Sequence, residues 1–191
     1  MNLPNKLTLM RIILTPIFMA VLYWGFPGAD YAALAIFMIA SLTDLLDGKI
    51  ARKYNLVTDF GKFADPLADK ILVTAAMLWF VEVGRMPAWA LLVVLLREFA
   101  VSGLRMIASD KGRVIAAGWS GKVKTAATMV CVIVMLLLGP ETAWAASNPL
   151  TAMPTGWLEW IDPICVWVIV LTTLYSGVEY FVKNKDVIAS A

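Results

Sequence analysis

Long apolar runs separated by short polar breaks make up most of this chain. Each run has about 20 residues, which is the length a helix needs to cross a bilayer. The runs occupy 7–26, 31–53, 64–83, 87–108, 121–139 and 160–182. We therefore predict an all-α polytopic membrane protein with six transmembrane helices, folded as a single domain over residues 1–191.

The breaks between the runs have turn or loop composition. G-F-P-G-A-D at 25–30 and E-V-G-R-M-P at 82–87 combine glycine and proline, so tight turns are expected there. The stretch 139–157 is the one long loop, and its prolines exclude a continuous helix.

Composition supports the membrane assignment and restricts the chemistry. The chain is 61% hydrophobic and 16% charged, values outside those of soluble domains. It has no histidine, which excludes a histidine base and histidine-ligated metals. Cys131 and Cys165 lie inside apolar runs, where a packing role is expected and a disulfide is not. No nucleic-acid partner is expected.

Basic residues predict the orientation in the membrane. With six spans, fourteen of the sixteen Lys and Arg residues fall on the side that carries both chain ends, while Arg85 falls on the other side and Arg97 within the fourth span. The positive-inside rule places the fourteen, and both termini, in the cytoplasm.

Four aspartates gather at the cytoplasmic ends of the second and third spans. Asp44 and Asp47 are three residues apart and Asp65 and Asp69 four apart, so each pair shares a helix face. A short linker makes the two spans antiparallel neighbours, which brings the pairs together. A carboxylate at bilayer depth costs about 2.5–3.5 kcal/mol, and divalent cations would offset this cost. Oxygen ligands suit Mg²⁺, Mn²⁺ or Ca²⁺, and two ions balance four carboxylates.

Small residues and one arginine accompany the aspartates. Gly48 and Ala51 leave room for a ligand, and Arg52 on the same face can bind a phosphate through its guanidinium. Simpler interpretations stay open for some positions. Asp65 before Pro66 has the sequence of a helix N-cap, and Gly48 and Ala51 also suit plain helix packing.

These residues form the pattern D-x2-D-G-x2-A-R-x8-G-x3-D-x3-D, from Asp44 to Asp69. The pattern resembles the signature of the CDP-alcohol phosphotransferases. Three other stretches, at 2–11, 97–105 and 121–125, are similar to the bacterial phosphatidylglycerophosphate synthases within that family. The resemblance implies a six-helix homodimer that transfers a phosphatidyl group from CDP-diacylglycerol to an alcohol and releases CMP.

The resemblance also implies roles for single residues. The four aspartates would hold two divalent cations, Mg²⁺ or Mn²⁺, and Asp69 would be the general base. The positions that would bind or shape the CDP-diacylglycerol site are Gly48, Arg52, Thr58 and Gly61, with Asn5 and Thr8 matched more loosely. The implied location is the bacterial inner membrane, with the active site facing the cytoplasm.

The acceptor is expected to be sn-glycerol 3-phosphate, a dianion that needs fixed cations. The candidates for binding its phosphate are Arg97, Arg105, Lys122 and Lys124. Arg97 alternatively pairs with Glu98, for which the sequence suggests no role, and the two lysines alternatively extend to the membrane interface.

Two alternative functions fit parts of the same pattern. The same chemistry with another acceptor, such as inositol phosphate, serine or phosphatidylglycerol, differs only in the acceptor pocket. A cation transporter would use the aspartates as ion ligands, but transport sites usually lie near the midplane rather than at one end of the helices.

Overall fold

The computed structural model describes residues 3–54, 59–110, 115, 118–138 and 160–185. Within these ranges, side chains are not described at residues 3, 4, 6, 44–54, 59–67, 69 and 110, so only the backbone is considered there.

All the regular secondary structure of the described residues is helical, as predicted. The helices are α1 (Leu3–Trp24), α2 (Ala29–Tyr54), α3 (Asp59–Glu82), α4 (Ala88–Asp110), α5 (Trp119–Leu138) and α7 (Ile161–Lys183). Each begins and ends within a few residues of a predicted span, and the largest difference is at α3, which begins at Asp59 rather than at residue 64. The described residues contain no strand.

Three of the helices are long and apolar enough to cross a membrane by length and composition. They are the segment Leu7–Trp24 of α1, α5 as a whole and α7 as a whole. In α2 the described apolar stretch, Ala29–Thr43, is shorter, and α3 and α4 carry charged residues such as Lys70 and Glu98. Six spans therefore remain a prediction, and three candidate spans are observed among the described residues.

Glycines make the two predicted tight turns. Gly25 and Gly28, between α1 and α2, have φ values of 61° and 89°, and Gly84, between α3 and α4, has a φ of 77°. Side chains with a Cβ rarely adopt these angles, so glycine suits all three positions. The predicted loop 139–157 lies outside the described residues.

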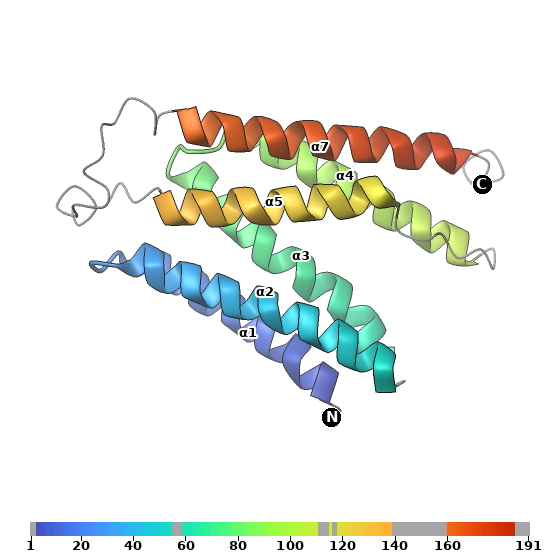
Figure 1. The fold of residues 1–191 in the computed structure, drawn as a ribbon, viewed down its shortest axis with the longest axis horizontal. Helices are drawn as coiled ribbons and strands as arrows, with labels where there is room; N and C mark the ends of the chain where they lie inside the picture. The colour runs from blue at the N-terminus through green and yellow to red at the C-terminus, as the bar shows by residue number, and fades with distance from the viewer. Residues whose placement is uncertain (1–2, 55–58, 111–114, 116–117, 139–159, 186–191) are drawn as a thin grey trace.

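The helices pack as two groups of three. In one group α1 packs against both α2 and α3, and in the other α7 packs against both α4 and α5. Contacts of α5 with α2 and α3, and of α3 with α4, join the groups. Figure 1 shows the two groups diverging towards one end, where α1 begins, α2 ends, α3 begins and α7 ends. We call this end the α2/α3 end.

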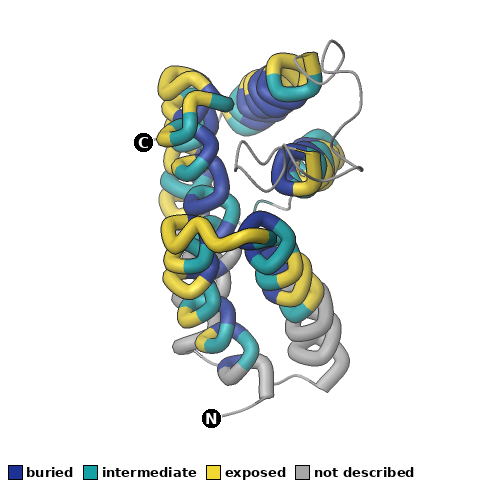
Figure 2. The backbone as a smooth tube through the Cα atoms, turned by 90° about the vertical axis from the view of Figure 1, so that its left-hand side faces the viewer, coloured by how far each residue is buried: buried dark blue, intermediate teal, exposed yellow. Residues whose placement is uncertain are grey.

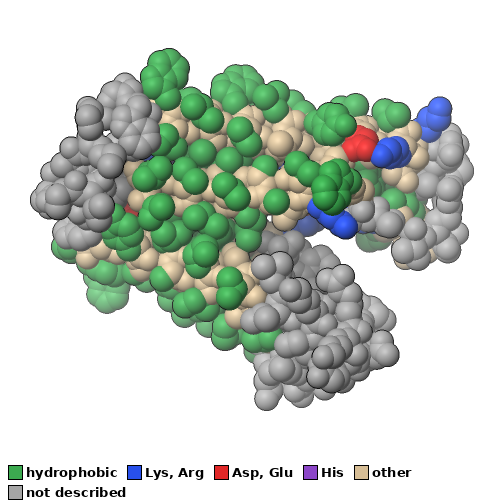
Figure 3. All heavy atoms as spheres, in the orientation of Figure 1, with side chains coloured by type: hydrophobic (Ala, Val, Ile, Leu, Met, Phe, Trp, Pro, Cys, Tyr) green, Lys and Arg blue, Asp and Glu red, His purple; other side chains and the backbone are tan. Residues whose placement is uncertain are grey.

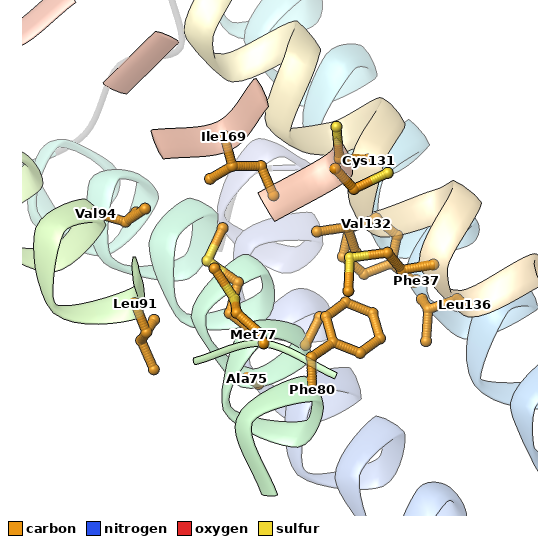
Figure 4. Packing of buried hydrophobic residues seen from close by; sticks show 14 of the residues in the cluster. Phe37, Ala75, Met77, Phe80, Leu91, Val94, Cys131, Val132, Leu136 and Ile169 are labelled. Atoms are coloured by element: carbon orange, nitrogen blue, oxygen red, sulfur yellow. The ribbon is translucent and has the colours of Figure 1, made fainter. Parts of the chain in front are cut away.

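The core lies along the contact between the two groups. Figure 4 shows Phe37 of α2, Phe80 of α3 and Val132 of α5 in one cluster of buried apolar side chains. Cys131 and Cys165 belong to this cluster as free thiols, which confirms their packing role. In Figure 2 exposed positions lie on the outward helix faces, and in Figure 3 apolar side chains cover most of the described surface in view. Such a surface suits a lipid environment.

A partly buried ion pair links helices at the other end of the bundle. Arg85, in the turn after α3, donates to both carboxylate oxygens of Asp162 in α7 over 2.7 and 2.6 Å. The same guanidinium donates to the carbonyl of Met135 in α5 over 2.7 Å and lies over the Phe80 ring. One side chain thus links α3, α5 and α7 at this end.

Candidate functional site

The backbone places the four signature aspartates at matching depths in α2 and α3. Asp44 lies ten residues before the last residue of α2, and Asp69 lies ten residues after the first residue of α3. Asp47 and Asp65 lie seven and six residues from the same helix ends. At a rise of 1.5 Å per residue, Asp44 and Asp69 each lie about 15 Å from that end of their helix. Asp47 and Asp65 each lie about 10 Å from it.

The side chains of the signature lie outside the described residues. This applies to the four aspartates and to Gly48, Arg52 and Gly61, whose backbone is helical. Thr58 is outside the described residues altogether. The side chains that are described contain no group of three or more potential metal ligands, but the signature aspartates are not among them. The metal site therefore stays a prediction. Among the described residues α2 and α3 each pack mainly against α1 and make fewer contacts with each other.

A buried polar face on α1 points to the same region. Asn5, Thr8, Arg11 and Thr15 follow helical spacing near the start of α1, and each is at most 7% exposed. Because α1 packs against both α2 and α3, this face lies among the helices that carry the signature. Asn5 and Thr8 were predicted for the CDP-diacylglycerol site. Arg11 was not, although its position three residues after Thr8 was a usable signal.

A cluster of charges joins α3, α4 and α5. Its members are Lys70, Arg97, Glu98 and Lys124, and we call it the Glu98 cluster. Lys124 Nζ donates to Glu98 Oε1 over 2.8 Å, and Arg97 donates to the same oxygen over 2.9 Å. Lys70 Nζ lies 3.4 Å from Glu98 Oε2 and donates to Ser102 Oγ. Both oxygens of one carboxylate thus face cations from three helices.

Arg97 lies between α4, α5 and α7. Its second terminal nitrogen donates to Ser176 Oγ over 2.5 Å. A Cβ built on Gly177 would lie 3.2 Å from Arg97 Cγ, and one on Gly121 would lie 3.7 Å from its terminal nitrogen. Gly177 therefore leaves space that this side chain needs, whereas a Cβ at residue 121 would make an ordinary contact. The ion pair with Glu98, the alternative expected for Arg97, is present.

The other two predicted acceptor residues lie elsewhere. Arg105 Nε donates to the Tyr180 hydroxyl over 3.1 Å, and its guanidinium lies 5.5 Å from the centre of that ring. Lys122 is exposed and points away from Lys124, because two residues rotate a helix by about 200°. Of the four predicted residues, the structure brings Arg97 and Lys124 together.

A small cavity of about 50 Å³ opens beside the Glu98 cluster. Its lining comes from α3, α4 and α5 and consists of Lys70, Val73, Thr74, Met77, Val94, Glu98, Lys124, Thr125, Thr128 and Met129. Two ammonium groups, one carboxylate and three hydroxyls thus share an otherwise apolar wall. Hydroxyls and ammonium groups are suitable donors to a phosphate or a polyol.

Sequence reasoning missed three residues of this region. Lys70 served only to predict orientation, Glu98 had no role, and Ser176 was not considered. The usable signal was Lys70 following Asp69, which placed a cation directly after the predicted base. The approach of Lys70 and Lys124 to Glu98 depends on how α3, α4 and α5 pack, which periodicity within one helix does not show.

One family model and several relatives match most of the chain. The family model for CDP-alcohol phosphatidyltransferase matches residues 1–175. A CDP-diacylglycerol–glycerol-3-phosphate 3-phosphatidyltransferase of Bacillus subtilis is 43% identical, over 100% of this chain and 98% of the relative. The protein of the same name in Rickettsia bellii is 36% identical over 96% of each chain. A probable phosphatidylglycerophosphate synthase of Mycobacterium tuberculosis is 40% identical over 73% of this chain and 68% of its own.

Proposed function

We propose that this chain, which belongs to the CDP-alcohol phosphatidyltransferase family, transfers the phosphatidyl group of CDP-diacylglycerol to sn-glycerol 3-phosphate, giving phosphatidylglycerol phosphate and CMP. The observation that carries the proposal is the full signature between Asp44 and Asp69, on two helices that hold its aspartates at matching depths. Relatives named for this reaction, similar over the whole chain, support it.

The aspartates fit divalent cations by the chemistry of the donor set. Members of the family use divalent cations, and we propose Mg²⁺ or Mn²⁺ as a pair here. Asp44, Asp47, Asp65 and Asp69 would hold them, because these are oxygen donors and the chain has no histidine. When bound, the cations supply charge neutralisation for the diphosphate and for the oxygen on which CMP departs.

Asp69 is the proposed general base. It accepts the proton of the acceptor hydroxyl as that oxygen forms a bond to the β-phosphorus, and the bond from this phosphorus to the CMP oxygen breaks. Asp69 directly precedes Lys70, which lines the cavity. This adjacency supports an acceptor site next to the base.

The donor site would lie along α1, α2 and the start of α3. We propose that Gly48, Arg52, Thr58 and Gly61 bind or shape the CDP part of the donor. Asn5 and Thr8 join them from the buried face of α1, and their burial against helices that carry the signature supports this assignment.

The acceptor site would use the cavity beside the Glu98 cluster. Lys124 and the newly identified Lys70 line the cavity. Arg97 does not line it but forms an ion pair with Glu98, which does. Arg105 and Lys122 remain candidates on the basis of sequence alone. The concentration of cations favours a phosphorylated acceptor over serine, which carries no phosphate.

The remaining proposals concern the whole protein. We propose one domain over residues 1–191, six membrane spans and a homodimer in the bacterial inner membrane, with both termini and the active site in the cytoplasm. The start of α1 and the end of α7 at the same end of the bundle support this topology.

The reaction is tested with purified protein, CDP-diacylglycerol and one acceptor at a time. We expect CMP release with sn-glycerol 3-phosphate and none with serine, inositol phosphate or phosphatidylglycerol. Asp69→Asn should abolish CMP release, because the amide cannot accept the proton, whereas Asp59→Asn at the start of the same helix should retain it. Release with a different acceptor would reject the assigned substrate. Near wild-type turnover in Asp69→Asn would reject the base.

A further inference from the structure

We propose that Glu98 is a positioning residue for the acceptor's phosphate, because it fixes the two cavity lysines in the arrangement that a phosphomonoester requires. The inference deepens the proposed function and rests on it. Glu98 would act through Lys70 and Lys124 and would not itself touch the acceptor phosphate, since both groups are anionic.

The geometry supports an anchor shared by three helices. Lysine side chains lose up to about 2 kcal/mol of rotamer entropy when they are fixed, so an unanchored lysine is a poorly defined ligand. Here Lys124 from α5 and Lys70 from α3 face different oxygens of the Glu98 carboxylate, at 2.8 and 3.4 Å. Ser102 accepts a further hydrogen bond from Lys70. The two lysines are thus held on one wall of the cavity before any ligand arrives.

Arg97 holds the Glu98 carboxylate without lining the cavity itself. It donates to Glu98 Oε1 and to Ser176 Oγ, and it fills the space beside Gly121 and Gly177. Its side chain is 13% exposed, compared with 34% for Lys70. Arg97 does not line the cavity and holds the carboxylate in place, whereas Lys70 and Lys124 line the cavity and Lys70 is the most accessible of the three cations.

The charge balance fits a dianion. Three cations and one carboxylate leave two positive charges in the Glu98 cluster. A phosphomonoester carries about −1.5 to −2 at pH 7. Without Glu98, three cations would face one another without a counter-ion, and their mutual repulsion would drive the lysines apart.

If the ion pairs of the Glu98 cluster were purely structural, their loss would affect stability and kinetics differently. Loss of a structural pair lowers stability and alters the handling of both substrates, whereas loss of a positioning residue selectively weakens use of the acceptor. The ratio of the two KM values therefore separates the roles.

The test measures both KM values for Glu98→Gln, with Glu179→Gln as the matched control. Glu179 also pairs with a lysine, Lys183, whose side chain is 66% exposed, and this pair lies outside the Glu98 cluster. We expect Glu98→Gln to raise the KM for sn-glycerol 3-phosphate by about tenfold, the usual cost of one charged hydrogen bond. The KM for CDP-diacylglycerol should change less than about twofold, and the control should match wild type in both.

A double-mutant cycle tests whether Glu98 acts through Lys124. If it does, Lys124→Gln should raise the acceptor KM much less in the Glu98→Gln background than in the wild type. Full additivity, an unchanged acceptor KM or equal changes in both KM values would overturn the inference. If Glu98→Gln does not fold, Glu98→Asp, which withdraws the charge by one methylene, must still raise the acceptor KM about threefold. A wild type without acceptor-dependent CMP release would instead reject the proposed function.

Discussion

Glycine determines how closely α7 can approach Arg97. Gly177 lies where a Cβ would stand 3.2 Å from Arg97 Cγ, closer than ordinary van der Waals contact. Arg97 has little freedom to move away, because its two terminal nitrogens are bound to Glu98 and Ser176. Glycine at residue 177 therefore allows Arg97, and with it the Glu98 cluster, to keep its observed position.

This argument predicts a difference between two glycine substitutions. Alanine in place of a helical glycine normally stabilises a protein by about 0.5–1 kcal/mol. We expect Gly103→Ala to show this gain, since nothing lies within 4 Å of the place its Cβ would take. Gly177→Ala should not stabilise the protein, because Arg97 must shift to make room for the new methyl group. The same shift should raise the acceptor KM. Thermal unfolding in detergent and acceptor kinetics measure both effects, and equal stabilisation of the two variants would contradict the argument.

At the scale of the element, α7 is fixed near both ends by side chains from the turn between α3 and α4 and from α4 itself. Near its start, Asp162 accepts two hydrogen bonds from Arg85, and further along Ser176 accepts one from Arg97. Tyr180 accepts another from Arg105. In an apolar solvent such bonds are not replaced by water, so they fix the rotation of α7 against α4.

The Arg85–Asp162 pair should be the strongest of these ties. Its side chains are 10% and 24% exposed, and removing one partner leaves a poorly solvated guanidinium. We expect Asp162→Asn to lower the free energy of unfolding by about 3 kcal/mol. Glu179→Gln removes a pair within one helix whose lysine is 66% exposed, so it should change the free energy of unfolding little. Thermal or denaturant unfolding of the two variants in the same detergent provides the comparison. Equal stabilities would show that the pair contributes nothing.

At the scale of the whole molecule, the two ends of the bundle differ in chemistry. The end where α1 stops and α4 and α7 begin carries the exposed tryptophans Trp24, Trp89 and Trp160, and Trp119 is exposed at the other end, where α5 begins. The α2/α3 end carries the signature and most of the basic residues. Exposed tryptophans near both ends and an excess of Lys and Arg at one end are typical of an oriented membrane protein.

The proposed orientation predicts where reporters fused to the chain ends will lie. A fluorescent protein at either terminus should be active, and an alkaline phosphatase at either terminus should be inactive, because both termini would face the cytoplasm. A phosphatase fused within the turn at 82–87, near Arg85, should be active. Active phosphatase at one terminus alone would imply an odd number of spans and contradict the six-span topology.

The sequence determined the helical class, the two tight turns and the family signature, because these depend on local composition and on spacing within one helix. It also placed cations in α4 and α5 as acceptor candidates. Only the tertiary structure decided that Lys124 and Lys70 meet at Glu98, while Lys122 points away and Arg105 turns to Tyr180. The physical reason is that a charge in an apolar bundle must find its counter-ion on whichever helix packs against it, and that neighbour is set by the rotation and contact of whole helices.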